Sequence, residues 1–261
     1  MRSQLFPPRV ITGCLVFIYS TPQKGYYLNL IEMFSAEAAA SDKSAILLPA
    51  GSLEQHGTEA PLGCDGIIAE ALCRKAGELT GCPVLPCLYY GNSHCHTGFS
   101  GTFSLSVETS VNLITDIISE AGRNGFRKLL ILSGHGGNRI AAEKAISELK
   151  AKISAEYSGY WQLPGYTEKE EELFGKTGYH ITTSEVSMVW HILKKPVPGV
   201  YSGCYPKTLP NTSDFTPEQW KEKYPDGGVG GDMSRVSTEK GCALFDYAVD
   251  MLAEKIREIR K

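Results

Sequence analysis

Short apolar runs alternate with longer amphipathic segments along most of the chain. Residues 44–50 (SAILLPA) and 128–132 (KLLIL) are apolar at almost every position, which is typical of strands buried on both faces. Further strands are predicted at 84–90 and 160–163. Apolar residues recur at helical spacing in the segments 67–79, 107–125, 140–155, 185–193 and 238–260. Strands that alternate with helices predict an α/β fold, in which a mostly parallel sheet carries helices on both faces.

Two stretches of the chain lack this pattern. Residues 10–19 are apolar and follow Arg2 and Arg9, but the run is too short to cross a membrane. We favour an N-terminal extension over residues 1–25, because no clear cleavage pattern follows the apolar run. A secretion signal is the alternative. Residues 196–231 are rich in Pro, Gly, Tyr and Trp and predict a long surface loop, which could form a lid. We therefore expect a single domain over residues 26–261.

Composition and charge narrow the classes of function. The chain has 261 residues, 42% hydrophobic and 21% charged, as in an ordinary globular protein. Its formal net charge is −3 and it has no basic block, so we expect neither nucleic-acid nor membrane binding. The eight cysteines form no C-x-x-C pair and no disulfide framework, which favours reduced thiols and a cytoplasmic location.

Polar clusters follow two of the predicted strands. The first strand runs into residues 51–57 (GSLEQHG), and the strand at 128–132 runs into residues 133–138 (SGHGGN). In open α/β sheets, ligands bind beyond the carboxyl ends of the strands. The sequence therefore predicts a binding site at this edge of the sheet.

Four residues near these strand ends are candidate metal ligands. Glu54 and His56 are two positions apart, so in an extended segment their side chains point to the same side. Asp65 stands at the predicted N-cap of the next helix, and His135 lies just past a central strand. Two carboxylates and two imidazoles suit Zn²⁺ or Mn²⁺. A carboxylate can also bridge two ions about 3.5–4 Å apart, and Asp65 is our choice for that bridge.

Each of these residues also has a simpler interpretation. Asp65 could only cap its helix, Glu54 could be a surface acid, and His56 could be a hydrogen-bonded polar residue. His135 could bind an anion together with neighbouring backbone amides. We favour the metal site because all four residues fall where this fold class places its sites.

Three later features are more ambiguous. Thr182 and Glu185 form a capping-box pattern ahead of an apolar helix, and local reasoning favours capping. His180 lies just before them and could be a general acid, a substrate-binding group or an exposed loop residue. Of His94 and His96, we expect His96 to line the pocket, and we do not expect a separate metal site there.

Several motifs together make the chain resemble the creatininase (creatinine amidohydrolase) family. They are residues 51–57 (GSLEQHG), 62–65 (LGCD), 90–93 (YGNS), 101–105 (GTFSL), 133–138 (SGHGGN), 184–187 (SEVS), 230–232 (GGD) and 238–241 (TEKG). The match runs from about residue 42 to the C-terminus. The resemblance implies a three-layer αβα sandwich with a two-metal centre, assembled as a homo-oligomer, often a hexamer.

The resemblance also implies roles for individual residues. Glu54 and His135 would hold one ion, His56 and Glu185 the other, and Asp65 would bridge them. His180 occupies the place of a histidine that handles substrate and transfers a proton. We assign substrate binding to the motif residues His96, Ser93 and Gly136.

Two departures from the family pattern bear on the substrate. Creatininases carry a glutamate two residues after the metal-binding histidine, where this chain has Gly137, and residues 181–184 (ITTS) replace a stretch of small residues. Both argue against creatinine. Related members hydrolyse other amide or formamide bonds, or cleave a peptide during cofactor maturation.

The sequence thus predicts a metal-dependent amidohydrolase that cleaves a non-peptide C–N bond of a small-molecule amide, either a cyclic amide or a formamide. A metal-bound hydroxide would attack the carbonyl carbon of the amide. We expect two divalent ions in the site, Zn²⁺ or alternatively Mn²⁺ or Fe²⁺. Three alternatives stay open: a metallopeptidase of cofactor maturation, a non-catalytic binding protein with a degenerate site, and a metal-free nucleotide-binding domain.

Overall fold

Three parallel strands form the centre of the molecule in the computed structural model. The structure describes residues 29–150, 152–176, 178–197, 215–228 and 230–261. Strands β1 (Ile46–Ala50), β2 (Lys128–Ser133) and β3 (Ser154–Gly159) lie side by side in the order β1-β2-β3. Ile46 pairs with Leu129, and Leu129 with Ala155, so all three strands end at the same edge of the sheet.

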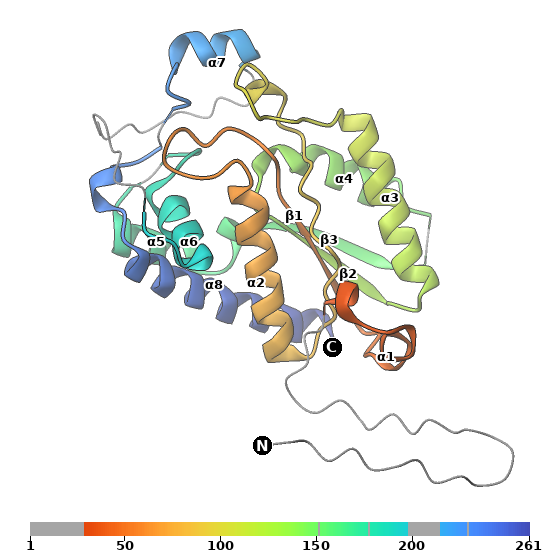
Figure 1. Ribbon diagram of the computed structural model, residues 1–261. Helices are drawn as coiled ribbons and strands as arrows, with labels where there is room; N and C mark the ends of the chain where they lie inside the picture. Colours follow the sequence, from red (N-terminus) through yellow and green to blue (C-terminus); the bar gives the residue numbers. More distant parts are fainter. Residues whose placement is uncertain (1–28, 151, 177, 198–214, 229) are drawn as a thin grey trace, which may run out of the picture.

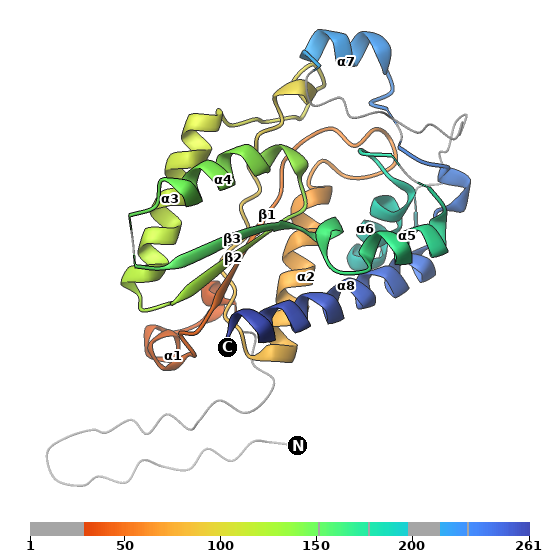
Figure 2. The same ribbon diagram turned by 180° about the vertical axis from the view of Figure 1, so that it is seen from behind.

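Helices cover both faces of this sheet, because alternate residues of β1 and β2 point to opposite sides. Leu47, Leu130 and Leu132 pack in a core with α2 (Cys64–Thr80), α6 (Thr183–Leu193) and α8 (Thr238–Ile259). Leu48 and Ile131 pack in a second core with α3 (Val107–Arg123) and α4 (Arg139–Ser147). Figures 1 and 2 show α3 and α4 together on one side of the strands, with α2, α6 and α8 on the other. The predicted αβα sandwich with a parallel sheet is confirmed.

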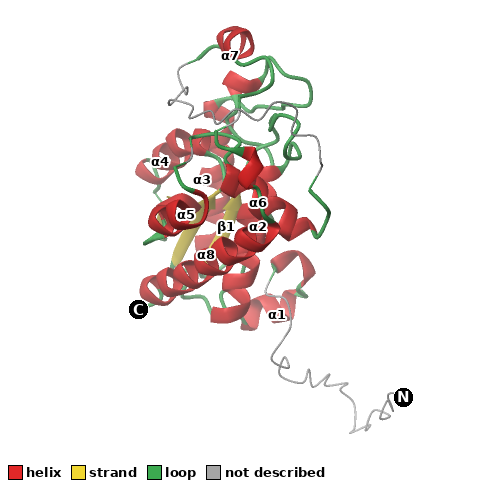
Figure 3. Ribbon diagram, turned by 90° about the vertical axis from the view of Figure 1, so that its left-hand side faces the viewer, coloured by secondary structure: helices red, strands yellow, loops and turns green. Residues whose placement is uncertain are grey.

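Shorter helices complete the described part of the chain (Figure 3). The α-helices are α1 (Ser35–Ala40), α5 (Tyr166–Phe174) and α7 (Pro217–Lys223). The 3-10 helices are η1 (Leu30–Glu32), η2 (His94–His96), η3 (Gly136–Asn138), η4 (Tyr160–Gln162) and η5 (Met233–Arg235). Figure 1 places α7 at the same end of the molecule as the loop that follows β1.

Three predicted elements were wrong in extent or type. Residues 84–90 make only isolated bridges to β1, at Val84 and Leu88, because Pro86 between them has no N–H for a ladder hydrogen bond. The helix predicted at 140–155 ends at Ser147, and the chain then enters β3. The strand predicted at 160–163 therefore lies earlier, at Ser154–Gly159, and residues 160–162 form η4 instead.

Some predictions concern residues that the structure leaves undescribed. The extension at 1–25 lies outside the described residues, so the domain boundary at residue 26 stays a prediction. Of the predicted loop at 196–231, residues 198–214 and 229 also lie outside, whereas residues 217–223 form α7. Within the described residues, no helix is both long and apolar enough to span a membrane. The six cysteines found there are free thiols.

Candidate metal centre

The segments that follow β1 and β2 bring the four strongest candidates into one buried cluster. Glu54 and His56 are 1% exposed, Asp65 is 2% exposed and His135 is 8% exposed. Burial of this degree contradicts the interpretation of Glu54 as a surface acid. The four side chains come from three separate segments: the loop after β1, the first turn of α2 and the loop after β2.

Two glycines allow α2 to start directly against the strand ends. A Cβ atom on Gly51 would lie 2.2 Å from the backbone N of Gly66, and one on Gly134 would lie 2.1 Å from the carbonyl O of Asp65. Any side chain at either position would push the first turn of α2 away from the sheet. The glycines of the two motifs thus place the Asp65 backbone between β1 and β2.

Asp65 lies at the centre of the cluster. Its Oδ1 is 3.1 Å from Nε2 of His56, and its Oδ2 is 3.1 Å from Nδ1 of His135. The hydroxyl of Ser52 donates a hydrogen bond to Oδ2 at 2.7 Å. Gly63, not Asp65, is the N-cap of α2, and the Asp65 side chain makes no capping hydrogen bond. The predicted N-cap role of Asp65 is therefore wrong, because its carboxylate turns inward to the histidines.

Backbone carbonyls orient the two histidines. The carbonyl O of Asn92 lies 3.0 Å from Nε2 of His135, and the carbonyl O of Glu54 lies 3.2 Å from Nδ1 of His56. A carbonyl only accepts, so each of these ring nitrogens carries the proton. The other nitrogen of each ring faces the Asp65 carboxylate. In the absence of a metal ion a second ring proton lies between them, and a bound metal ion would take the place of that proton.

The electrostatics of the cluster lead to the same conclusion. Burial by itself would lower the pKa of His56, but the Asp65 carboxylate outweighs it and raises that pKa to about 10. Burial opposes a charged Glu54, yet His135 and its neighbours hold the pKa of Glu54 well below its usual range. Glu54 Oε2 is buried without a hydrogen-bond partner among the described residues, 3.2 Å from Nδ1 of His135. The site attracts positive charge, and its carboxylates disfavour the alternative in which His135 binds an anion.

Glu185 both caps a helix and faces the cluster. Thr182 is the N-cap of α6, and its backbone N donates to Glu185 Oε2 at 3.0 Å, which confirms the capping box. The hydroxyl of Tyr160 lies 3.5 Å from Oε1. Glu185 is nevertheless buried, and burial raises the pKa of its carboxyl to about 7. Capping and proximity to the site are therefore compatible.

The described residues contain three groups of side chains that could each hold an ion. Within each group, one ligand atom per residue lies within 4.8 Å of the others. The groups are Glu54 with Asp65 and His135, His56 with Asp65 and Glu185, and Glu54 with His56 and His180. The first two share Asp65, so they match a pair of ions bridged by that carboxylate.

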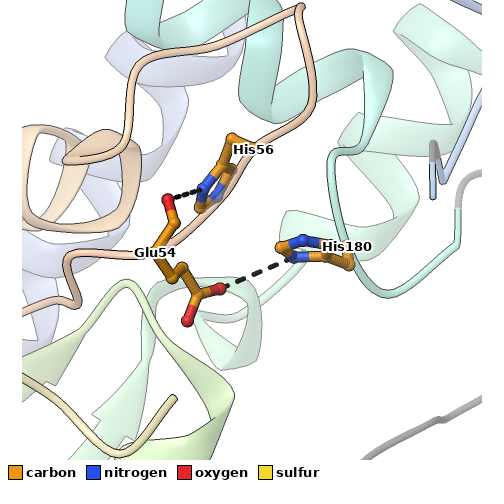
Figure 4. Close-up of side chains that lie close together, drawn as sticks. All are labelled: Glu54, His56 and His180. Atoms are coloured by element: carbon orange, nitrogen blue, oxygen red, sulfur yellow. Dashed lines mark hydrogen bonds and ion pairs between the residues drawn. The ribbon is translucent and has the colours of Figure 1, made fainter. Parts of the chain in front are cut away.

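His180 and His96 form a second layer next to this centre. Their rings are stacked with centroids 4.3 Å apart, and His180 is 8% exposed, so the exposed-loop interpretation of His180 is wrong. Nδ1 of His180 lies 3.6 Å from Oε1 of Glu54, and Figure 4 shows these two side chains facing each other with His56 nearby. Burial, with the neighbouring His96 and His56, holds the pKa of His180 well below its usual range.

The remaining predicted site residues lie around the loop after β2. The hydroxyl of Ser93 is buried 3.4 Å from Nε2 of His135. A Cβ atom on Gly136 would meet no atom within 4 Å, so Gly136 borders open space. A Cβ atom on Gly137 would lie 2.2 Å from the carbonyl O of Asn92, so the backbone leaves no room for the glutamate of the creatininase pattern. His94 is exposed and belongs to none of the three groups among the described residues.

Sequence reasoning missed Gln55. In a regular strand the side chain of residue 55 would point away from those of Glu54 and His56. The chain is irregular here, however, and Gly57 has a φ of 60°. The Gln55 amide is buried, and its Nε2 lies 2.8 Å from Nε2 of His180. Its place between two ligand-type residues was the one signal in the sequence.

Comparisons with known proteins identify relatives of this chain. Residues 30–256 match the family model described as creatininase, creatinine amidohydrolase. The chain is 28% identical over 244 residues to a creatinine amidohydrolase of Pseudomonas putida, which covers 86% of this chain and 93% of that protein. It is 36% identical over 120 residues to a mycofactocin precursor peptide peptidase of Mycobacterium ulcerans, covering 41% of this chain and 46% of that protein. The structure of a mutant creatininase of Zn–Zn type superimposes with a TM-score of 0.78 at 24% identity, covering 89% of this chain and 98% of that one.

Proposed function

The chain belongs to the creatininase family, and from that premise we propose that it is a metal-dependent amidohydrolase that cleaves a non-peptide C–N bond, in a cyclic amide or a formamide. One observation carries the proposal. Nε2 of His56 and Nδ1 of His135 both face the Asp65 carboxylate at 3.1 Å, while a backbone carbonyl holds the other nitrogen of each ring, which is how metal-binding histidines are oriented.

Two ions would share Asp65. Glu54 and His135 would complete the first site with Asp65, and His56 and Glu185 the second. This set of nitrogen and oxygen donors suits Zn²⁺, with Mn²⁺ or Fe²⁺ as alternatives. The Zn–Zn type of the similar creatininase structure supports zinc. When bound, such ions lower the pKa of water and stabilise negative charge on the substrate oxygen.

His180 would move the proton. Its lowered pKa keeps the ring neutral near pH 7, so it can accept the proton that the attacking water releases. It then donates that proton to the leaving nitrogen of the amide. Ser93, His96 and Gly136 would contact the substrate, which we propose is not creatinine because Gly137 leaves no room for the family's glutamate.

The similarity to a mycofactocin precursor peptide peptidase supports a second candidate, a metallopeptidase that acts on a modified peptide. A substrate panel of cyclic amides, N-formyl compounds and short peptides distinguishes the amidohydrolase from the metallopeptidase. A chain that binds one ion or none, and turns over no member of the panel, would instead be a non-catalytic binding protein. Assembly into a homo-oligomer is also part of our proposal.

The experiment starts with metal content. We expect two ions per chain by elemental analysis, and hydrolysis of a cyclic amide or formamide that stops when a chelator removes them. Asp65→Ala should lose both ions and all turnover. Asp116→Ala, at an exposed position on α3, is the control and should keep both. An Asp65→Ala protein that still holds two ions would rule out the bridging role.

A further inference from the structure

The Asp65 carboxylate has contacts of two kinds. Each oxygen faces a histidine, since Oδ1 lies 3.1 Å from Nε2 of His56 and Oδ2 lies 3.1 Å from Nδ1 of His135. Oδ2 also accepts a hydrogen bond from the hydroxyl of Ser52 at 2.7 Å. This length is typical of a hydroxyl bonded to a charged carboxylate, which is about twice as strong as a bond between neutral groups. Ser52 and Asp65 are 0% and 2% exposed, so bulk water does not compete for the bond.

The backbone on both sides of Ser52 is held by hydrogen bonds. The backbone N of Gly51 donates to the carbonyl O of Leu88 at 2.8 Å, and the carbonyl O of Leu53 accepts from the backbone N of Phe103 at 2.9 Å. Neither bond involves a candidate metal ligand, so both can form before any ion binds. The Ser52 hydroxyl therefore has a fixed position just after β1, and the carboxylate must turn to meet it.

This hydrogen bond limits how the carboxylate can bind ions. A carboxylate can hold two ions with one oxygen each, or a single ion with both oxygens. In the structure Oδ1 faces His56 and Oδ2 faces His135, which offers one oxygen to each ion of the proposed pair. Turning both oxygens toward one ion would carry Oδ2 away from Ser52 and leave the buried hydroxyl without this acceptor, which costs free energy. The bond therefore favours the bridging mode.

We propose that Ser52 is a positioning residue that fixes the bridging mode of Asp65, so that the centre holds two ions and not one. This deepens the proposed function, because it rests on Asp65 being a ligand of both ions. Ser52 acts only through the Asp65 carboxylate, to which its hydroxyl donates. The role also gives a function to the serine of the motif at residues 51–57, whose Glu54 and His56 are candidate ligands themselves.

Zinc titrations of the full chain test this role. Ser52→Ala removes the hydroxyl, and we expect the first ion to bind as in the wild type and the second about 10–100-fold more weakly, the usual effect of losing a hydrogen-bond partner of a metal ligand. Ser187→Ala is the matched control. Ser187 is also 0% exposed and donates a hydrogen bond at 2.6 Å, but to the carbonyl O of Thr183 within α6. This variant should bind both ions like the wild type.

Electron paramagnetic resonance with Mn²⁺ in place of zinc reports on the bridge itself. Two Mn²⁺ ions joined by a bridging carboxylate are magnetically coupled, and their signal differs from that of isolated ions. With two Mn²⁺ ions added per chain, we expect the coupled signal from the wild type and from Ser187→Ala, and mainly the signal of isolated ions from Ser52→Ala. A role of Ser52 in stability alone would weaken both ions together and would not separate the two signals in this way.

The outcomes separate this proposal from the proposed function. A wild type that binds fewer than two ions contradicts the two-metal centre itself. A wild type that binds two, with both affinities of Ser52→Ala unchanged or equally weakened, contradicts only the role of Ser52. If Ser52→Ala fails to fold, a crystal structure of the zinc-loaded wild type decides the matter. One oxygen of Asp65 on each ion, with Ser52 still donating to the carboxylate, would support the proposal, and both oxygens on one ion or a broken hydrogen bond would overturn it.

Discussion

Substituting alanine for Gly134 should disrupt the metal centre from a position that contributes no ligand. The added Cβ atom would lie 2.1 Å from the carbonyl O of Asp65 and 2.8 Å from its carbonyl C. Ordinary contact begins near 3.4 Å, so the first turn of α2 must move away by about 1.3 Å. No rotamer change relieves this contact, because both partners are backbone.

Two measurable effects follow from this displacement. Overpacking against backbone should lower the free energy of unfolding of the metal-free protein by about 2–3 kcal/mol, which corresponds to a melting temperature about 4–12 °C lower. A ligand atom must lie within about 0.2 Å of its ideal distance from an ion, and Asp65 would be displaced several times further. We therefore expect zinc to bind at least about 10-fold more weakly.

Gly136→Ala is the control, since it adds the same methyl group to the same loop. Its Cβ atom would meet nothing within 4 Å. Melting curves with chelator and with zinc, together with zinc titrations, should show Gly136→Ala behaving like the wild type and Gly134→Ala losing both stability and affinity. The reasoning is refuted if Gly134→Ala melts and binds zinc like Gly136→Ala.

Three further predictions concern the residues of the centre. Glu185→Gln keeps the capping box, because glutamine can also accept from the Thr182 backbone N, so the metal-free variant should melt like the metal-free wild type. The zinc-loaded variant should hold one ion fewer than the wild type by elemental analysis, and two ions would show that Glu185 only caps the helix. His180→Asn should lower kcat about 10²–10⁴-fold with both ions retained, and loss of an ion would instead identify His180 as a ligand. The raised pKa of His56, about 10 against 6.5, stabilises the metal-free fold fully below pH 6.5, and this contribution is lost as the pH rises toward 10. The lowered pKa of Asp65, about 2 against 3.8, acts in the acid range, where its contribution is present above pH 3.8 and lost toward pH 2. Urea unfolding of chelated protein across this range checks both, and a stability that stays flat between pH 6.5 and 10 would contradict the His56 assignment.

Burial explains which strands could be predicted. β1 and the interior part of β2 are buried throughout, so each appears in the sequence as a continuous apolar run. β3 (SAEYSG) pairs on one side only and has exposed or half-buried residues at its first four positions. An edge strand with so few apolar residues carries no distinctive hydrophobic pattern, so the sequence predicts a longer preceding helix in its place.

The metal-ligand candidates were predictable because strand ends concentrate them, whereas the surrounding contacts are tertiary. Glu54 and His135 follow strands that pair with each other, so the topology alone brings them together. The proximity of His180 to Glu54 depends on the turn before α6, where Ile181 has a φ of 50°. The contact of Gln55 with Gly227 joins residues 172 positions apart, and no local pattern predicts it.

Glu185 shows why capping and metal binding need not be alternatives. An exposed capping glutamate would keep an ordinary pKa, but this one is 8% exposed, and burial raises its pKa to about 7. It also lies in one group with His56 and Asp65, where a second carboxylate adds repulsion unless a cation is present. The cap fixes Oε2 through the Thr182 backbone N at 3.0 Å, which holds the carboxylate rigidly beside the cluster. Gly137 has no room for a side chain, and the first turn of α6 is where this chain offers a carboxylate already held beside His56 and Asp65.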